Sequence, residues 1–189
     1  MHSNRPWDSF MSQKVLLTAK EVNIILHRLA CQLIENHTTF SNTVLIGIQP
    51  RGKYLANRLC QLLKEDYKIK NIESGDLDIT FYRDDFRRND KTLEANTTNI
   101  NFIVENKNVV FVDDVLHTGR SIRAALTAIQ SFGRPNEIEL LVLIDRRFSR
   151  HLPIQPNYKG LQVDAINEEK VKVFWKENEG KDKVVLVQE

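Results

Sequence analysis

Short runs of apolar residues, each followed by an amphipathic pattern, constrain the fold of this chain more than any other feature. The runs cover residues 43–48, 109–112 and 138–144. Apolar residues at helical spacing follow the first two runs, namely Leu55, Leu59, Leu62 and Leu63, then Ile122, Ala125, Leu126 and Ile129. Strands that are apolar on both faces are typical of parallel sheets covered on both sides. The sequence therefore predicts an α/β fold, a central mainly parallel sheet flanked by helices.

Three further patterns extend this sheet. Thr18 followed by Glu21 has the form of a capping box and predicts a first helix that ends near His37. Apolar and polar residues alternate over 77–82, which predicts a half-buried strand. Apolar alternation over 171–175, the turn sequence Asn178-Glu179-Gly180 and the run 184–187 predict a closing C-terminal β-hairpin.

The length and composition indicate an ordinary globular domain. With 189 residues, 41% hydrophobic and 28% charged, the chain is long enough to bury one continuous core. Residues 1–14 lack a periodic pattern, so we expect a disordered leader there and a single domain over residues 15–189. The formal net charge of +2 is too close to neutral to indicate nucleic-acid binding by bulk electrostatics.

Cysteine content and hydropathy indicate the compartment. Cys31 and Cys60 each lie alone in an apolar helical pattern, so neither a disulfide framework nor a zinc spacing is formed. No stretch approaches the roughly 18 uninterrupted apolar residues of a membrane span. We therefore expect a cytoplasmic protein without a membrane partner.

The segment VVFVDDVLHTGRS, residues 109–121, carries most of the chemical information. Its apolar strand leads to Asp113 and Asp114, adjacent carboxylates that are costly unless they bind hydroxyls or a cation. Residues 118–121 then open a helix, whose free amides and hydroxyls suit an anion. Acids that only end a strand and a threonine that only caps a helix are common, but the joint spacing favours one site for a phosphorylated ribose.

This segment resembles the phosphoribosyl diphosphate signature of the type I phosphoribosyltransferases. Residues 48–52 (IQPRG), 75–86 (GDLDITFYRDDF) and 141–153 are similar to the PyrR family, bifunctional pyrimidine-operon regulators and uracil phosphoribosyltransferases. The similarity extends from Lys14 over nearly the whole chain. It implies the type I phosphoribosyltransferase fold, with a flexible hood loop and the C-terminal hairpin.

The resemblance also implies roles for individual residues. Arg51, Asp113 and Asp114 are the implied catalytic residues. Those implied to bind phosphoribosyl diphosphate (PRPP) are Arg51, Gly52, Asp113, Asp114, Val115, His117, Thr118, Gly119, Arg120 and Ser121. The polar, aperiodic stretch 83–99 fits the hood loop, with Arg83, Asp84, Asp85, Arg87 and Arg88 at its start. Asp145 and Arg146 correspond to the family's nucleobase segment.

The implied reaction joins uracil to PRPP, giving uridine monophosphate (UMP) and pyrophosphate. The implied cofactor is Mg²⁺, held mainly by the substrate, with Asp113 and Asp114 as candidate protein ligands. Purine-using relatives carry an aspartate where this chain has His117, so a pyrimidine is favoured. The family's habit also implies a homo-oligomer, a dimer or higher.

Two alternatives remain open at this level. The first is a pyrimidine-sensing regulator with weak or no catalysis that binds pyrimidine-operon leader mRNA through Arg28, Arg147, Arg150 and Lys159. The second is a nucleotide triphosphatase, because Gly47, Gly52 and Lys53 have Walker A spacing. Tyr54 then stands where that loop needs a small hydroxyl residue.

Overall fold

The computed structural model describes residues 13–84, 96–165 and 169–188. Its main sheet has five parallel strands in the order β3-β2-β4-β5-β6. These strands are β2 (Thr43–Ile48), β3 (Glu73–Leu77), β4 (Asn108–Leu116), β5 (Glu137–Arg146) and β6 (Tyr158–Val163). The central strands are buried on both faces, as the apolar runs predict.

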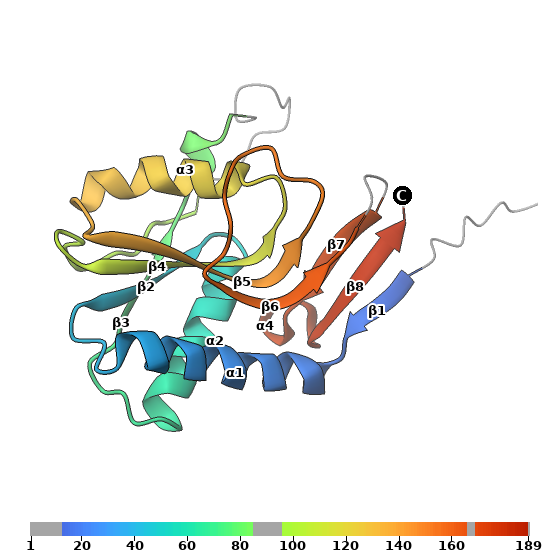
Figure 1. The fold of residues 1–189 in the computed structure, drawn as a ribbon, viewed down its shortest axis with the longest axis horizontal. Coiled ribbons are helices and arrows are strands. Elements are labelled where there is room, and N and C mark those ends of the chain that lie inside the picture. The colour runs from blue at the N-terminus through green and yellow to red at the C-terminus, as the bar shows by residue number, and fades with distance from the viewer. Residues whose placement is uncertain (1–12, 85–95, 166–168, 189) are drawn as a thin grey trace, which may run out of the picture.

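Helices cover both faces of this sheet (Figure 1). Helices α1 (Ala19–His37) and α2 (Gly52–Glu65) pack on one face, and α3 (Arg120–Ala128), continued by the 3₁₀ turn η2 (Ile129–Phe132), packs on the other. The capping box is present, because the Thr18 hydroxyl accepts from the Glu21 amide and the Glu21 carboxylate accepts from the Thr18 amide. The predicted α/β fold is confirmed, and none of the helices within the described ranges is long and apolar enough to cross a membrane.

A second, antiparallel sheet has the strand order β1-β8-β7. It combines β1 (Gln13–Leu17) with β7 (Glu169–Phe174) and β8 (Lys183–Gln188), and the short helix α4 (Lys176–Glu179) joins the last two. The predicted hairpin is therefore confirmed. Its buried residues Val173, Trp175 and Val184 belong to the same core as α1 and α2. Gln13 and Lys14, assigned to the leader by the sequence, are part of β1, while residues 1–12 lie outside the described ranges.

The predicted strand over residues 77–82 is wrong in position. The strand β3 ends at Leu77, and Thr80–Tyr82 form a 3₁₀ turn, η1. The Asp78 carboxylate accepts hydrogen bonds from the backbone N–H and the hydroxyl of Thr80, which turns the chain away from the sheet. Phe81 is consequently 64% exposed and does not point into the core.

Candidate active site

An acid pair lies near the carboxyl end of β4. Asp113 and Asp114 are each only 9% exposed. Because consecutive strand residues point to opposite faces, the two carboxylates serve different cavities. Asp113 lines a cavity of about 310 Å³ at the start of α3, the α3 cavity. Asp114 lines a cavity of about 540 Å³ beside β7, the β7 cavity. Val115 lines both, so the acid pair stands at their junction.

Burial makes the charge of this pair costly. It raises the pKa of Asp113 well above the ordinary value, the neighbouring charge of Asp114 adds to the rise, and the hydrogen bond from the Asp114 amide (2.9 Å) opposes it. Burial also raises the pKa of Asp114, and the positive charge of Arg51 opposes that shift. Buried carboxylates of this kind are suited to ligands that bring hydroxyl donors or a cation.

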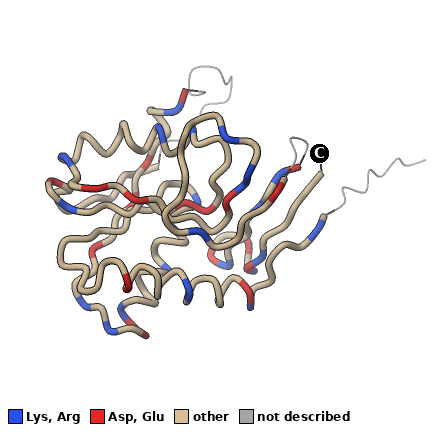
Figure 2. The backbone as a smooth tube through the Cα atoms, viewed as in Figure 1, with Lys and Arg blue, Asp and Glu red and all other residues tan. Residues whose placement is uncertain are grey.

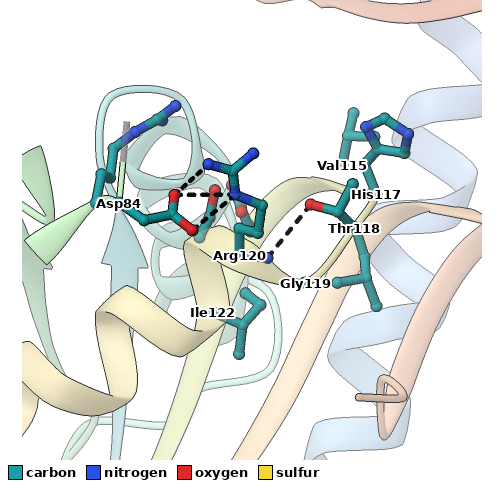
Figure 3. Close-up of a pocket in the computed structure, with 11 residues that line it drawn as sticks. Asp84, Val115, His117, Thr118, Gly119, Arg120 and Ile122 are labelled. Carbon is teal, nitrogen blue, oxygen red and sulfur yellow. Dashed lines mark hydrogen bonds and ion pairs between the residues drawn. The ribbon is translucent and has the colours of Figure 1, made fainter. Parts of the chain in front are cut away.

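The α3 cavity is built around a helix start. Gly119, at φ 91°, precedes α3 in the left-handed conformation that glycine adopts without strain. The Thr118 hydroxyl accepts from the Arg120 amide at 3.4 Å, and Ser121 also lines the cavity (Figure 3). Amides, hydroxyls and the positive end of the helix dipole are therefore gathered around one cavity, an arrangement that suits an anion.

Asp84 also lines this cavity. Its carboxylate accepts from Arg120 Nε at 2.9 and 3.0 Å (Figure 3). It also accepts from Arg123 Nη2 at 2.5 Å. The hydrogen bond from Arg120 is the main cause that lowers the pKa of Asp84 to about 2. Arg83 lines the same cavity. The start of the predicted hood loop thus adjoins the helix start, while Asp85, Arg87 and Arg88 lie outside the described residues.

Arg51 is the last residue of the short connection between β2 and α2, Gly52 is the first residue of α2, and the peptide bond between Gln49 and Pro50 in this connection is cis. A Cβ atom on Gly52 would stand 2.3 Å from the Val112 carbonyl oxygen and 3.0 Å from the Asp113 Cα. Only glycine therefore allows this approach to β4. Arg51 lines the β7 cavity with Asp114, and its guanidinium donates to the Val173 carbonyl oxygen and, at 2.9 Å, to Glu179 Oε1.

Comparison with known proteins agrees with this geometry. The model of the phosphoribosyl transferase domain matches residues 12–178. The relative named Bifunctional protein PyrR from Desulfosudis oleivorans is 43% identical over 171 residues, covering 90% of this chain and 94% of its own. The protein of the same name from Gloeothece citriformis is 45% identical over 172 residues, covering 91% and 96%. This chain belongs to the PyrR family of phosphoribosyltransferases.

Solved structures show the same fold for this PyrR-family chain. A hypoxanthine phosphoribosyltransferase from Staphylococcus aureus aligns with a TM-score of 0.67 at 19% identity, covering 99% of this chain and 98% of its own. That of Trypanosoma cruzi aligns with a TM-score of 0.69 at 16% identity, covering 93% and 96%. At such identities the likeness concerns the fold alone.

The two residues expected to bind the nucleobase do not face one cavity of the PyrR-family chain. Asp145 accepts a hydrogen bond from Arg150 and lines a groove of about 650 Å³ beside β6, the β6 groove. Arg146 is the next residue of β5, so its side chain points to the opposite face. Burial lowers the pKa of Arg146 there, and the negative charge of Glu169 in β7 opposes this shift. Burial, and then the charge of Arg146, lower the pKa of His117.

The connection between β2 and α2 does not form the Walker A loop that the triphosphatase hypothesis requires. Gly47 lies inside β2, where a Cβ atom would meet the Lys53 Cα at 2.6 Å, and only residues 49–51 separate β2 from α2. A Walker A loop needs a longer glycine-rich connection to surround phosphates.

Two residues at the site were missed by the sequence analysis. Arg123 shares Asp84 with Arg120, and its position one turn into α3 was a signal that could have identified it. Glu179 holds Arg51 from 128 positions away in the chain, a separation at which no local pattern connects two residues.

Proposed function

We propose that this chain transfers the phosphoribosyl group of PRPP to uracil, giving UMP and pyrophosphate. The supporting observation is the buried acid pair at the junction of the α3 cavity, which contains a helix start, and the β7 cavity, which Arg51 lines. The 5'-phosphate fits the helix start in the α3 cavity, and the diphosphate fits the β7 cavity beside Arg51. The ribose between them would meet Asp113 and Asp114, whose carboxylates accept hydrogen bonds from its hydroxyls.

The reaction forms one bond and breaks another at the anomeric carbon. A ring nitrogen of uracil attacks this carbon as the bond to the diphosphate oxygen breaks, the electron pair of that bond leaves with pyrophosphate, and the proton of the nitrogen passes to solvent water. Arg51 stabilises the negative charge that develops on the leaving group, and the acid pair holds the ribose in line. No dedicated general base is assigned, so positioning and electrostatics carry most of the acceleration.

The donor set fits a magnesium ion held mainly by the substrate. No group of three metal-binding side chains occurs within the described ranges, so the protein alone does not form a complete site there. Asp113 and Asp114 would supply carboxylate oxygens, and the substrate's phosphate oxygens and water would complete the six ligands that magnesium prefers. The bound ion would neutralise charge on the diphosphate.

Uracil is the proposed base for two reasons. The relatives at 43% and 45% identity are PyrR proteins, the family of uracil-using regulators. In addition, His117 occupies the position where purine-using relatives carry an aspartate. A histidine supplies no carboxylate to the ring nitrogen of a purine, and burial, followed by the charge of Arg146, lowers the pKa of His117.

Incubation with uracil, PRPP and magnesium tests the proposal. We expect UMP and pyrophosphate to appear in equal amounts, and hypoxanthine to react at least about 100-fold more slowly, because a site built for one base leaves buried polar groups unpaired with another. Product formation can be followed by chromatography, with circular dichroism as the check on folding. A folded protein that makes no UMP would contradict the assignment.

A second candidate function is RNA binding, favoured by the clustering of the predicted contacts. Arg147, Arg150 and Lys159 line the β6 groove, and Arg28 donates two hydrogen bonds to the Lys159 carbonyl. Ion pairs reduce the positive charge that this groove offers to RNA, because Arg147 pairs with Asp164 and Arg150 pairs with Asp145. Basic and acidic residues are interspersed over the molecule (Figure 2), so only a local surface can serve.

A gel-shift titration with the leader RNA of the organism's pyrimidine operon tests this second function. We expect a retarded complex that weakens with rising salt, and about a tenfold loss of affinity on Lys159→Ala, which removes a phosphate-binding charge. The matched control is Lys64→Ala, at the end of α2 and away from the groove. Equal affinities for both variants would exclude the β6 groove.

A further inference from the structure

The connection between β7 and β8 is fastened to α2 at two points. At the start of α2, Arg51 contacts Val173 and Glu179. Further along α2, Arg58 donates to the Glu177 carboxylate at 2.7 and 2.6 Å and to Asp182 at 2.7 Å, and its guanidinium stacks 4.8 Å from the Trp175 ring centre. The contacts of Arg58 hold the hairpin against α2. Glu179 therefore binds Arg51 from a fixed position.

Glu179 is itself held in one orientation. Its Oε2 accepts from the Trp175 amide at 2.8 Å, and its Oε1 accepts from Arg51 Nη2 at 2.9 Å. Trp175 is fully buried, so its backbone offers a rigid reference. Because one oxygen of the Glu179 carboxylate is fixed by the buried Trp175 backbone, the other oxygen holds the Arg51 guanidinium in a defined orientation.

The arrangement leaves Arg51 with donors for a substrate. A guanidinium has five N–H groups. Arg51 gives one to the Val173 carbonyl and one to Glu179, and the remaining three can bind phosphate oxygens. Its charge acts on Asp114, and both residues line the β7 cavity. Two contacts on the hairpin therefore hold the guanidinium in the cavity that Asp114 lines.

We propose that Glu179 is a positioning residue for the reaction, orienting Arg51 toward the leaving diphosphate. This inference rests on the proposed function. A carboxylate beside a diphosphate site repels the ligand, so Glu179 reduces substrate affinity through its charge. Its benefit appears as the diphosphate departs, when an aligned guanidinium stabilises the developing charge. The turn that the sequence identified only as part of a hairpin thus contributes to the site.

Steady-state kinetics of Glu179→Gln test this role. The variant keeps the size of the side chain and an oxygen for the Trp175 amide, but loses the charge that holds Arg51. We expect kcat to fall about tenfold while the KM for PRPP stays within about twofold of wild type or decreases. Glu179→Asp, which keeps the charge, should retain a higher kcat than Glu179→Gln. The matched control is Glu177→Gln on the same helix. Arg58 keeps its contacts with Asp182 and the Trp175 ring in this variant, so the hairpin stays in place and both constants should remain within about twofold.

A double-mutant cycle with Arg51→Ala identifies the route of the effect. If Glu179 acts through Arg51, adding Glu179→Gln to Arg51→Ala changes kcat less than about twofold. Two results with an active wild type would overturn this inference and leave the proposed function standing. In the first, Glu179→Gln has the same kcat as Glu177→Gln. In the second, the kcat losses of Glu179→Gln and Arg51→Ala multiply in the double variant. A wild type that makes no UMP overturns both the inference and the proposed function.

Discussion

Asp113→Asn is expected to abolish most activity and to stabilise the fold at neutral pH. Turnover of uracil should fall about 100-fold or more, because the amide no longer offers a charged acceptor to the ribose or the ion. The free energy of unfolding should rise by on the order of 1 kcal/mol, because the folded protein no longer buries a carboxyl group whose ionisation is disfavoured there. The side-chain carbonyl oxygen of the new asparagine can still accept from the Asp114 amide, so the loop keeps its hydrogen bond.

The stability effect should depend on pH in one direction. The folded pKa of Asp113 lies well above its ordinary value of 3.8, so the folded state keeps the proton after the unfolded chain has lost it. The free energy of unfolding of the wild type therefore falls as pH rises from 3.8 through the folded pKa of Asp113. At pH values above the folded pKa, the whole loss of stability is present. The stability advantage of Asp113→Asn should vanish near pH 3.8 and increase with pH until the folded pKa is passed.

Urea unfolding between about pH 4 and about pH 8 measures this difference. Asp182→Asn is the control with the opposite sign. Burial alone would raise the pKa of Asp182, but the hydrogen bonds from Arg58 and the Lys176 amide outweigh burial and the net pKa is lowered. Asp182→Asn should therefore destabilise the protein at neutral pH. If Asp113→Asn also destabilises it there, the Asp113 charge is compensated within the protein and the acid pair has a structural role.

The sequence predicts a strand correctly where a local apolar run defines it, and less well where pairing with a neighbouring strand defines it. The run 43–48 coincides with β2, because all six residues are buried and apolar apart from Thr43 and Gly47. The run 109–112 ends too early, since β4 continues to Leu116. The acidic residues interrupt the apolar pattern, yet Asp113 still pairs with Val142, and Val115 with Ile144, of β5. Pairing with a neighbouring strand outweighs local composition there.

The sequence did not predict strands β1 and β6, because both depend on pairing with a neighbouring strand more than on a local apolar pattern. Residues Gln13 to Leu17 pair with Val184 to Val187, which are far along the chain. In β6, Lys159, Gly160 and Gln162 weaken the apolar signal, although Gly160 is required because its Cβ would stand 2.3 Å from the Leu143 carbonyl oxygen. The signature segment, in contrast, contains its strand, its loop and its helix start within a few residues. Local sequence therefore predicts the α3 cavity, while contacts such as Arg51 with Glu179 require the assembled fold.

Gly52→Ala is expected to reduce both stability and turnover. The new Cβ would lie 2.3 Å from the Val112 carbonyl oxygen, closer than real contacts allow. Val112 cannot retreat, because it is fully buried and paired with Gly47 of β2 and Leu141 of β5. The start of α2 must move instead. We expect a loss of about 1–3 kcal/mol in the free energy of unfolding from overpacking.

The displacement also moves Arg51 away from Asp114, so turnover per folded molecule should fall about 100-fold. Gly160→Ala is the matched control, because its Cβ would meet the Leu143 carbonyl oxygen at the same 2.3 Å without touching the α2 start. It should cost similar stability but keep turnover per folded molecule within about threefold. Denaturant unfolding and single-turnover rates separate the two effects. Equal turnover in both variants would mean that the approach of Gly52 to β4 serves packing and does not set the position of Arg51.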